Sequence, residues 1–169
     1  MDKDIYELFA DNNKRSDIKM NNIIKDISEE EWNKQFSFYW KSIHELCSHI
    51  YIGDYGWLNI FRTFTKSKDD EYFNKKYNWG ELIFENKEEY LRKRNELDDK
   101  IIEYINEIGN NDLIKIMEID NYDGTKVKMK LGTYIMHMFL HSIHHKSQIS
   151  LYLDTIVKVN DFTILFNEE

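Results

Sequence analysis

The chain of 169 residues carries a net charge of −8, and its apolar fraction of 41% and aromatic fraction of 15% exclude a disordered polymer. The net negative charge and the lack of a basic stripe argue against nucleic-acid binding. The sequence contains no apolar run of about 18 residues, so we expect no membrane-spanning helix. One cysteine, Cys47, and a charged N-terminal stretch without a secretory signal favour a cytoplasmic protein, which we expect to form a single domain over residues 1–169.

The absence of proline and the presence of only six glycines favour long helices. Residues 4–27 read as a first helix, with one face formed by Ile5, Phe9, Asn12, Ser16, Ile23 and Ile27. The two polar residues on this face have two interpretations, a partly exposed helix or an inward polar patch near a site. Ser28 and Glu31 then form a capping-box pattern, which predicts a short helical turn.

A second long helix is predicted over residues 36–64. Its apolar stripe contains Tyr39, Ile43, Leu46, Ile50, Gly53, Trp57, Phe61 and Phe64. Residues 65–85 mix charges and aromatic side chains without a sustained period, so we expect a long crossover loop with a short helical piece. A third helix is expected to begin after Asn86, a good N-cap, and to stop at Gly109.

Beyond Gly109 the period changes, and the alternation around Ile114, Ile116, Val127 and Met129 predicts a hairpin that turns at residues 121–124. A last helix is predicted over residues 131–157. The tail that follows is expected to pack Phe162 and Phe166 on the body of the protein. The predicted fold is therefore all-α: a four-helix bundle with a long helix 2–helix 3 crossover and a small β-hairpin before the last helix.

Four of the six histidines lie on the last predicted helix, within residues 137–145. A helix turns about 100° per residue, so His141 and His145 share one flank of its core-facing side. His137 and His144 lie further round, away from the core. The i, i+4 spacing of His141 and His145 places two imidazoles on successive turns, as two ligands of one metal ion require.

The second predicted helix places His49 at a flank of the core and His44 on the opposite side, facing solvent or a partner. Three neutral imidazoles plus a water would form an open metal site of the catalytic type. The alternative is that these histidines are hydrogen-bonded packing residues, and helical geometry alone leaves the two interpretations balanced. The motif is not HExxH, because Ser142 follows His141.

Two segments carry a family resemblance. HMFLHSIHHKSQISLYLD, from His137, resembles the last-helix signature of the DinB/YfiT-like superfamily, and HELCSHIYIGDYGWLNIF, from His44, resembles its second-helix segment. The resemblance covers essentially the whole chain. It implies a divalent metal held by His49, His141 and His145. The chain departs from the family at Lys146-Ser147, where Arg-Gly is usual, but neither position is a ligand.

The resemblance also implies chemistry. Similarity to this family implies a divalent metal ion as cofactor, with Zn or Ni as the first candidates, and a low-molecular-weight thiol as a second cofactor. The implied activity is that of a thiol-dependent S-transferase or a hydrolase acting on a small molecule. The alternative function is a non-catalytic helical bundle that binds a ligand or partner and keeps its histidines for structure. Family members often dimerise, and Met136, Leu140 and Ile143 form a second apolar stripe, so we expect a homodimer.

Overall fold

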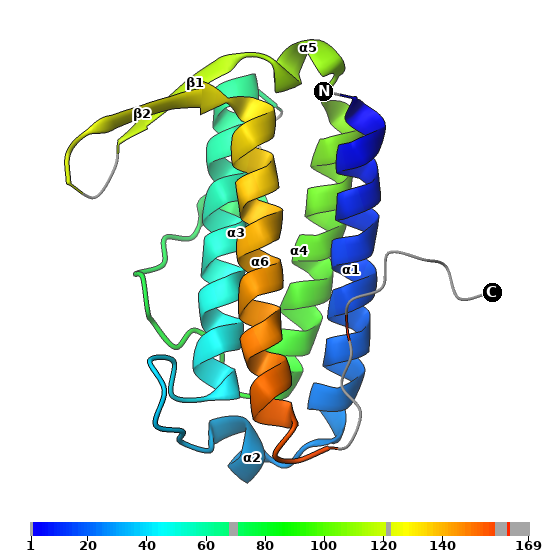
Figure 1. The fold of residues 1–169 in the computed structure, drawn as a ribbon, viewed down its shortest axis with the longest axis vertical. Coiled ribbons are helices and arrows are strands. Elements are labelled where there is room, and N and C mark those ends of the chain that lie inside the picture. The colour runs from blue at the N-terminus through cyan, green and yellow to red at the C-terminus, as the bar shows by residue number, and fades with distance from the viewer. Residues whose placement is uncertain (1, 68–70, 121–122, 158–161, 163–169) are drawn as a thin grey trace.

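The computed structural model describes residues 2–67, 71–120, 123–157 and 162. Four long helices lie side by side, with a β-hairpin at one end of the bundle and a short helix at the other (Figure 1). The long helices are α1 (Lys3–Asp26), α3 (Ile43–Thr65), α4 (Lys87–Glu107) and α6 (Leu131–Leu153). The short elements are α2 (Glu29–Asn33), the 3₁₀ turn η1 (Glu71–Asn74), α5 (Asn110–Leu113), β1 (Ile116–Asp120) and β2 (Lys126–Lys130). The predicted all-α bundle with one small hairpin is confirmed.

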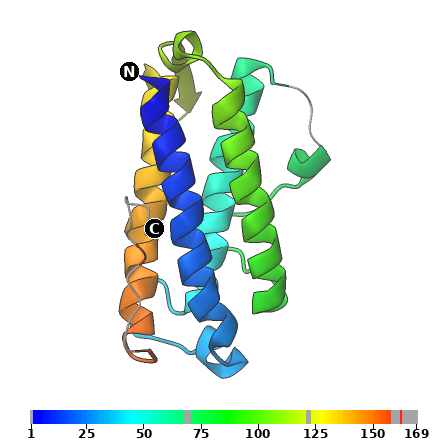
Figure 2. The ribbon, with the colours of Figure 1, turned by 90° about the vertical axis from the view of Figure 1, so that its right-hand side faces the viewer.

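The long crossover is a consequence of helix direction. Helices α3 and α4 run the same way, so the segment between them returns along the outside of the bundle (Figures 1 and 2). It contains η1, the predicted short helical piece. Helix α4 begins after Asn86, whose side chain accepts a hydrogen bond from the Glu89 backbone N–H, as the sequence predicts. No described helix is long and apolar enough to cross a bilayer.

The predicted start of the second long helix is wrong. Helix α3 begins at Ile43, because Ser42 is its N-cap and accepts a hydrogen bond from the Glu45 backbone N–H. The preceding aromatic residues do not extend the helix: Tyr39 is 87% exposed, and the Phe36 ring packs 4.4 Å from the ring of Tyr152 on α6. Aromatic residues in this irregular segment happened to match a helical period.

The buried face of α1 also differs from the prediction. Ile5 is 46% exposed, and the helix buries Tyr6, Ala10, Asn12, Asn13, Asp17, Met20 and Ile24. The observed buried face of α1 is therefore rotated about the helix axis relative to the predicted face. Asn12 is buried, which decides between the two interpretations of the polar residues on α1: the patch faces inward.

The predicted end of the third helix at Gly109 is confirmed, because α4 ends at Glu107 and Ile108 is its C-cap. Gly109 also precedes α5, a short helix that the sequence did not predict. Helix α6 ends at Leu153, before the predicted residue 157. Within the hairpin, Met117 pairs with Met129 and Ile119 with Val127.

Ile116 lies on the opposite face of the hairpin and is 59% exposed. Ile114 precedes the strand and is also exposed. Phe162 is buried as predicted, whereas Phe166 lies outside the described residues.

A buried charge network joins all four long helices. Arg94 on α4 is 0% exposed and donates hydrogen bonds to Asp54 on α3, at 2.7 Å, and to Asp98 on α4, at 2.5 Å. Lys146 on α6 lies 2.8 Å from Asp17 on α1, whose Oδ2 is also 3.8 Å from Arg94 Nε. Buried charges are costly unless they are paired, so this network specifies how the four helices fit together.

The network holds three carboxylates and two cations, which leaves one formal negative charge in the core. Burial raises the pKa of Asp54 to about 6 and that of Asp98 to about 7, and Arg94 opposes both shifts. The ionised form of each carboxyl therefore depends on Arg94. Removing the guanidinium would leave buried carboxylates without their main counter-ion.

We predict that Arg94→Met lowers the free energy of unfolding at pH 7 by about 3–5 kcal/mol, measured by urea denaturation. A raised folded-state pKa means that stability is lost as pH rises through it, so the penalty should be smaller at pH 5, where the carboxyls take up protons. Arg92→Met is the control, because Arg92 forms an exposed pair with Glu96. Equal losses in both variants would contradict this account of the core.

Candidate metal centre

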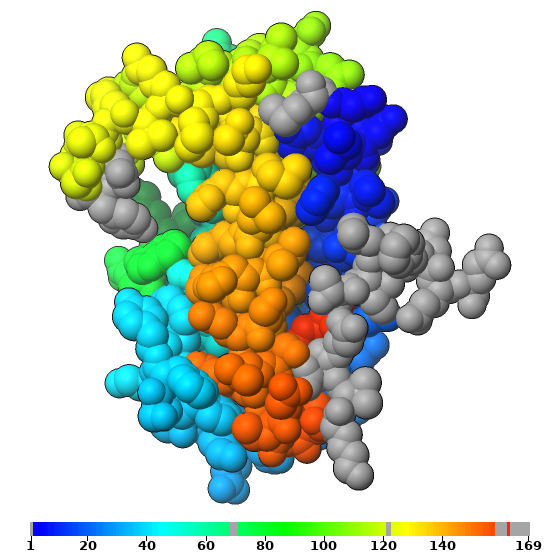
Figure 3. Space-filling view, viewed as in Figure 1, coloured from blue at the N-terminus to red at the C-terminus, as the bar shows by residue number. Residues whose placement is uncertain are grey.

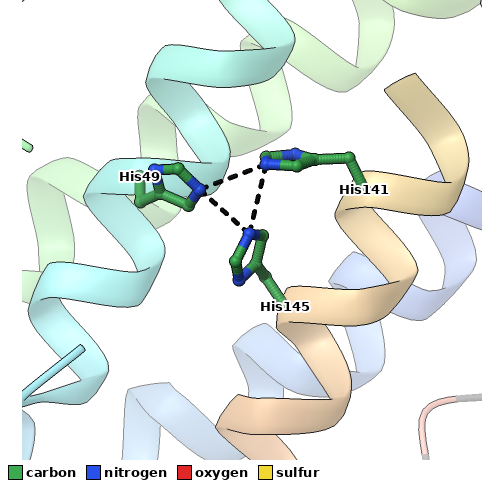
Figure 4. Close-up of side chains that lie close together, drawn as sticks. All are labelled: His49, His141 and His145. Atoms are coloured by element: carbon green, nitrogen blue, oxygen red, sulfur yellow. Dashed lines mark hydrogen bonds between the residues drawn. The ribbon is translucent and has the colours of Figure 1, made fainter. Parts of the chain in front are cut away.

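The structure brings three histidines together between α3 and α6 (Figure 4). The Nε2 atom of His49 lies 3.1 Å from that of His141 and 2.9 Å from that of His145, and the last two are 3.1 Å apart. His49 and His145 are buried, and His141 is partly exposed. All three rings therefore point their Nε2 atoms at one common point.

Local helix geometry accounts for this convergence. His141 and His145 are one turn apart on α6, so their side chains lie above one another on the flank that faces α3. Gly53 on α3 leaves room for the His141 ring: a Cβ at this position would lie 3.2 Å from His141 Cε1 and 3.5 Å from its Nδ1. The missing side chain of Gly53 thus allows the His141 ring to rest against the α3 backbone.

The three imidazoles are uncharged at neutral pH. Burial lowers the pKa of His49 to about 3 and that of His141 to about 4, and neighbouring imidazoles add smaller contributions. Burial also lowers the pKa of His145, against the opposing effect of its hydrogen bond to Gln148. Neutral imidazole is the form that binds metals, so burial keeps the Nε2 atoms unprotonated and able to bind a metal ion.

Gln148 orients one of the ligands. Its Oε1 lies 2.6 Å from His145 Nδ1, so this nitrogen donates a hydrogen bond and the Nε2 lone pair faces the cluster. The sequence analysis did not assign Gln148 a role, although its i, i+3 spacing from His145 on one helix is a usable signal. The Nδ1 atoms of His49 and His141 are buried and have no hydrogen-bond partner among the described residues.

The donor set fits a divalent metal ion. Three Nε2 atoms at mutual distances of 2.9–3.1 Å cannot satisfy one another, since each neutral ring has one N–H and Nδ1 already carries it in His145. Tetrahedral zinc with imidazole ligands places the nitrogens about 3.3 Å apart, which is close to the observed spacing. The cluster can therefore bind such an ion with only small adjustments of the rings.

The other histidines divide into two groups. His137 and His144 are exposed, as predicted. The prediction that His44 faces solvent or a partner is wrong: His44 is buried, with its Nδ1 3.0 Å from Asn33 Oδ1 and its ring stacked 5.0 Å from that of Trp32. The short helix α2 covers this flank of α3, and the sequence pattern did not reveal that packing.

Two tryptophans border the cluster from irregular segments. The Trp40 ring lies 4.1 Å from the His49 ring, and the Trp79 ring lies 4.6 Å from it. Sequence reasoning missed both residues at the site. Trp79 lies in the predicted crossover loop, and Trp40 lies in a segment that was wrongly predicted as helix, so neither position could be placed beside His49 from the sequence.

Comparisons with known proteins agree with the fold and the histidine cluster. No curated protein matches the chain. The sequence model of the DinB family matches residues 1–156, which run from the first residue through the end of α6. This range contains all three clustered histidines and both segments that carry the resemblance. The chain therefore belongs to the DinB family.

Proposed function

We propose that the protein is a metal-dependent enzyme of the thiol-transferase type. His49, His141 and His145 hold a divalent ion, with zinc and nickel as the first candidates, and a low-molecular-weight thiol occupies the remaining ligand position. The observation that carries this proposal is the convergence of three uncharged imidazole Nε2 atoms, within 3.1 Å of one another, from two helices. The partly exposed side of His141 gives small molecules access.

A divalent ion held by these residues supplies the acidity that converts a bound thiol into a nucleophilic thiolate at neutral pH. The protein's own contribution is the charge balance of the site. Among the described residues, the group of ligand atoms within 4.8 Å of one another consists of three imidazole nitrogens, with no carboxylate among them. Three neutral ligands leave the charge of a divalent ion uncompensated, which favours an anionic ligand such as thiolate.

The same observation makes a hydrolase the weaker candidate. Hydrolysis by activated water is usually assisted by a nearby general base such as glutamate or aspartate. Among the described residues, no carboxylate belongs to the group of ligand atoms that lie within 4.8 Å of one another at the cluster. A thiol needs no such base once its proton has been lost, so the residues present suit thiol transfer better.

The metal content of the purified protein tests the site. We expect about one equivalent of a divalent metal in wild type purified without a nickel column, measured by elemental analysis. His141→Ala should lose most of it, whereas His137→Ala, which alters an exposed histidine on the same helix, should retain it. A metal-free wild type whose melting temperature does not rise with Zn²⁺ or Ni²⁺ would support the non-catalytic alternative instead.

A second prediction tests the role of Gly53. Gly53→Ala should weaken metal binding by about tenfold, because the new Cβ pushes the His141 ring away from its position. Gly56→Ala is the matched control on the same helix, since a Cβ there meets nothing within 4 Å. Titration calorimetry with Zn²⁺ on both variants measures the difference. An unchanged affinity in Gly53→Ala would show that this close approach does not position the ligand.

The chemistry is tested by mixing the metal-loaded protein with a low-molecular-weight thiol and an alkyl halide. The thiolate sulfur forms a bond to carbon as the halide leaves with the bonding electron pair, and the thiol proton passes to solvent. We expect product formation in wild type to exceed that in His141→Ala by at least about a hundredfold. Equal rates in the two proteins would exclude the proposed reaction, whatever the metal content.

A further inference from the structure

We infer that Trp40 and Trp79 form the walls of the ligand site, and that the site prefers ligands with a flat aromatic group beside the metal-binding atom. This inference rests on the proposed function and adds a substrate class to it. The ligand that fits best is an aromatic thiol or the aromatic electrophile with which a thiol reacts. The positions of the two indole rings beside the three histidines, and the exposure of Trp79, support this preference.

Each tryptophan borders a different edge of the histidine triangle. Trp40 lies 4.1 Å from the His49 ring at an angle of 30°, and 6.2 Å from the His145 ring, edge-on. Trp79 lies 4.6 Å from the His49 ring, edge-on, and 6.4 Å from the His141 ring. A ligand on the cluster would therefore meet indole rings on two sides.

Trp40 is the fixed wall. It is partly buried, and its backbone carbonyl accepts a hydrogen bond from the Tyr152 hydroxyl of α6. The neighbouring Phe36 and Phe38 rings stack on Tyr152 as well, at 4.4 and 5.4 Å. The segment that carries Trp40 is thus attached to the same helix as His141 and His145, which keeps the indole in register with the cluster.

Trp79 is presented by a tight turn. The Glu81 backbone N–H donates to the Asn78 carbonyl at 3.1 Å, and Glu81 Oε2 accepts from the Asn78 backbone N–H at 2.8 Å. Gly80 has φ +80°, the left-handed value that this turn position requires and that glycine adopts without strain. The turn holds the backbone of Trp79 in place independently of any packing by its side chain.

The Trp79 side chain is 55% exposed although it touches two of the three histidines. An indole that is half exposed gains free energy when an apolar group covers it. On the face shown in Figure 3, the crossover segment that contains the turn lies between the β-hairpin and residues 36–42, beside α6. Ligands approaching the cluster from this side reach the exposed indole.

The rings closest to the cluster point to the same ligand class. Outside the triad itself, the indoles of Trp40 and Trp79 are ring partners of the clustered histidines. Indole faces attract flat aromatic groups by stacking. Beyond the atom bound by the metal, the ligand is therefore recognised by stacking.

Cobalt-loaded protein tests this inference by absorption spectroscopy. Titration with benzyl mercaptan and with ethanethiol measures the affinity of an aromatic thiol and of its truncated analogue. We expect wild type to bind benzyl mercaptan about tenfold more tightly than ethanethiol. Trp79→Ala should reduce this preference to about twofold, with most of the change in the affinity for benzyl mercaptan.

Tyr39→Ala is the control, because Tyr39 is 87% exposed and its ring contacts Trp40 rather than the histidines. It should keep the tenfold preference. Equal affinities for the two thiols in wild type, or an undiminished preference in Trp79→Ala, would overturn the inference while the cobalt spectrum still confirms the metal centre. Absence of cobalt absorption in wild type would instead overturn the proposed function, and the inference with it.

Discussion

The buried guanidinium of Arg94 is the interaction on which the rest of the bundle depends. It pairs with carboxylates from α3 and α4, and Asp17 connects it through Lys146 to α6. Each helix contributes a charge that only the correct arrangement can satisfy. Lys146 follows His145 directly, so the contact that sets the rotation of α6 also sets the direction of its histidines. The metal centre therefore inherits its geometry from the charged core.

The charged core and the histidine cluster use different residues. Arg94 and Lys146 engage the buried carboxylates, whereas among the described residues the grouped ligand atoms of the cluster are imidazole nitrogens alone. A carboxylate beside the cluster would favour protonated histidine, which cannot bind a metal. Burial lowers the pKa of each of the three histidines and so favours neutral rings.

Periodicity in the sequence predicted the parts of the structure that depend on regular helices. Helical rotation placed His49, His141 and His145 at flanks of the core and left their role open, and the family resemblance implied the same three residues. The structure brings these three histidines together. The contribution of irregular segments was not predictable in this way. The cover that α2 places on His44, and the approach of Trp79 to His49, depend on the path of loops in three dimensions. The ion pair between Asp17 and Lys146 was equally unpredictable, because a sequence pattern assigns charged residues to the surface.

The residues around the cluster come from two structurally different sources. The imidazoles belong to helices of the rigid bundle, whereas the two indoles come from connecting segments that carry none of the charged core. Changes in connecting segments are tolerated more easily than changes in packed helices. Descendants of this protein can thus acquire new ligand preferences by altering a few loop positions, and they need not sacrifice metal retention or folding to do so.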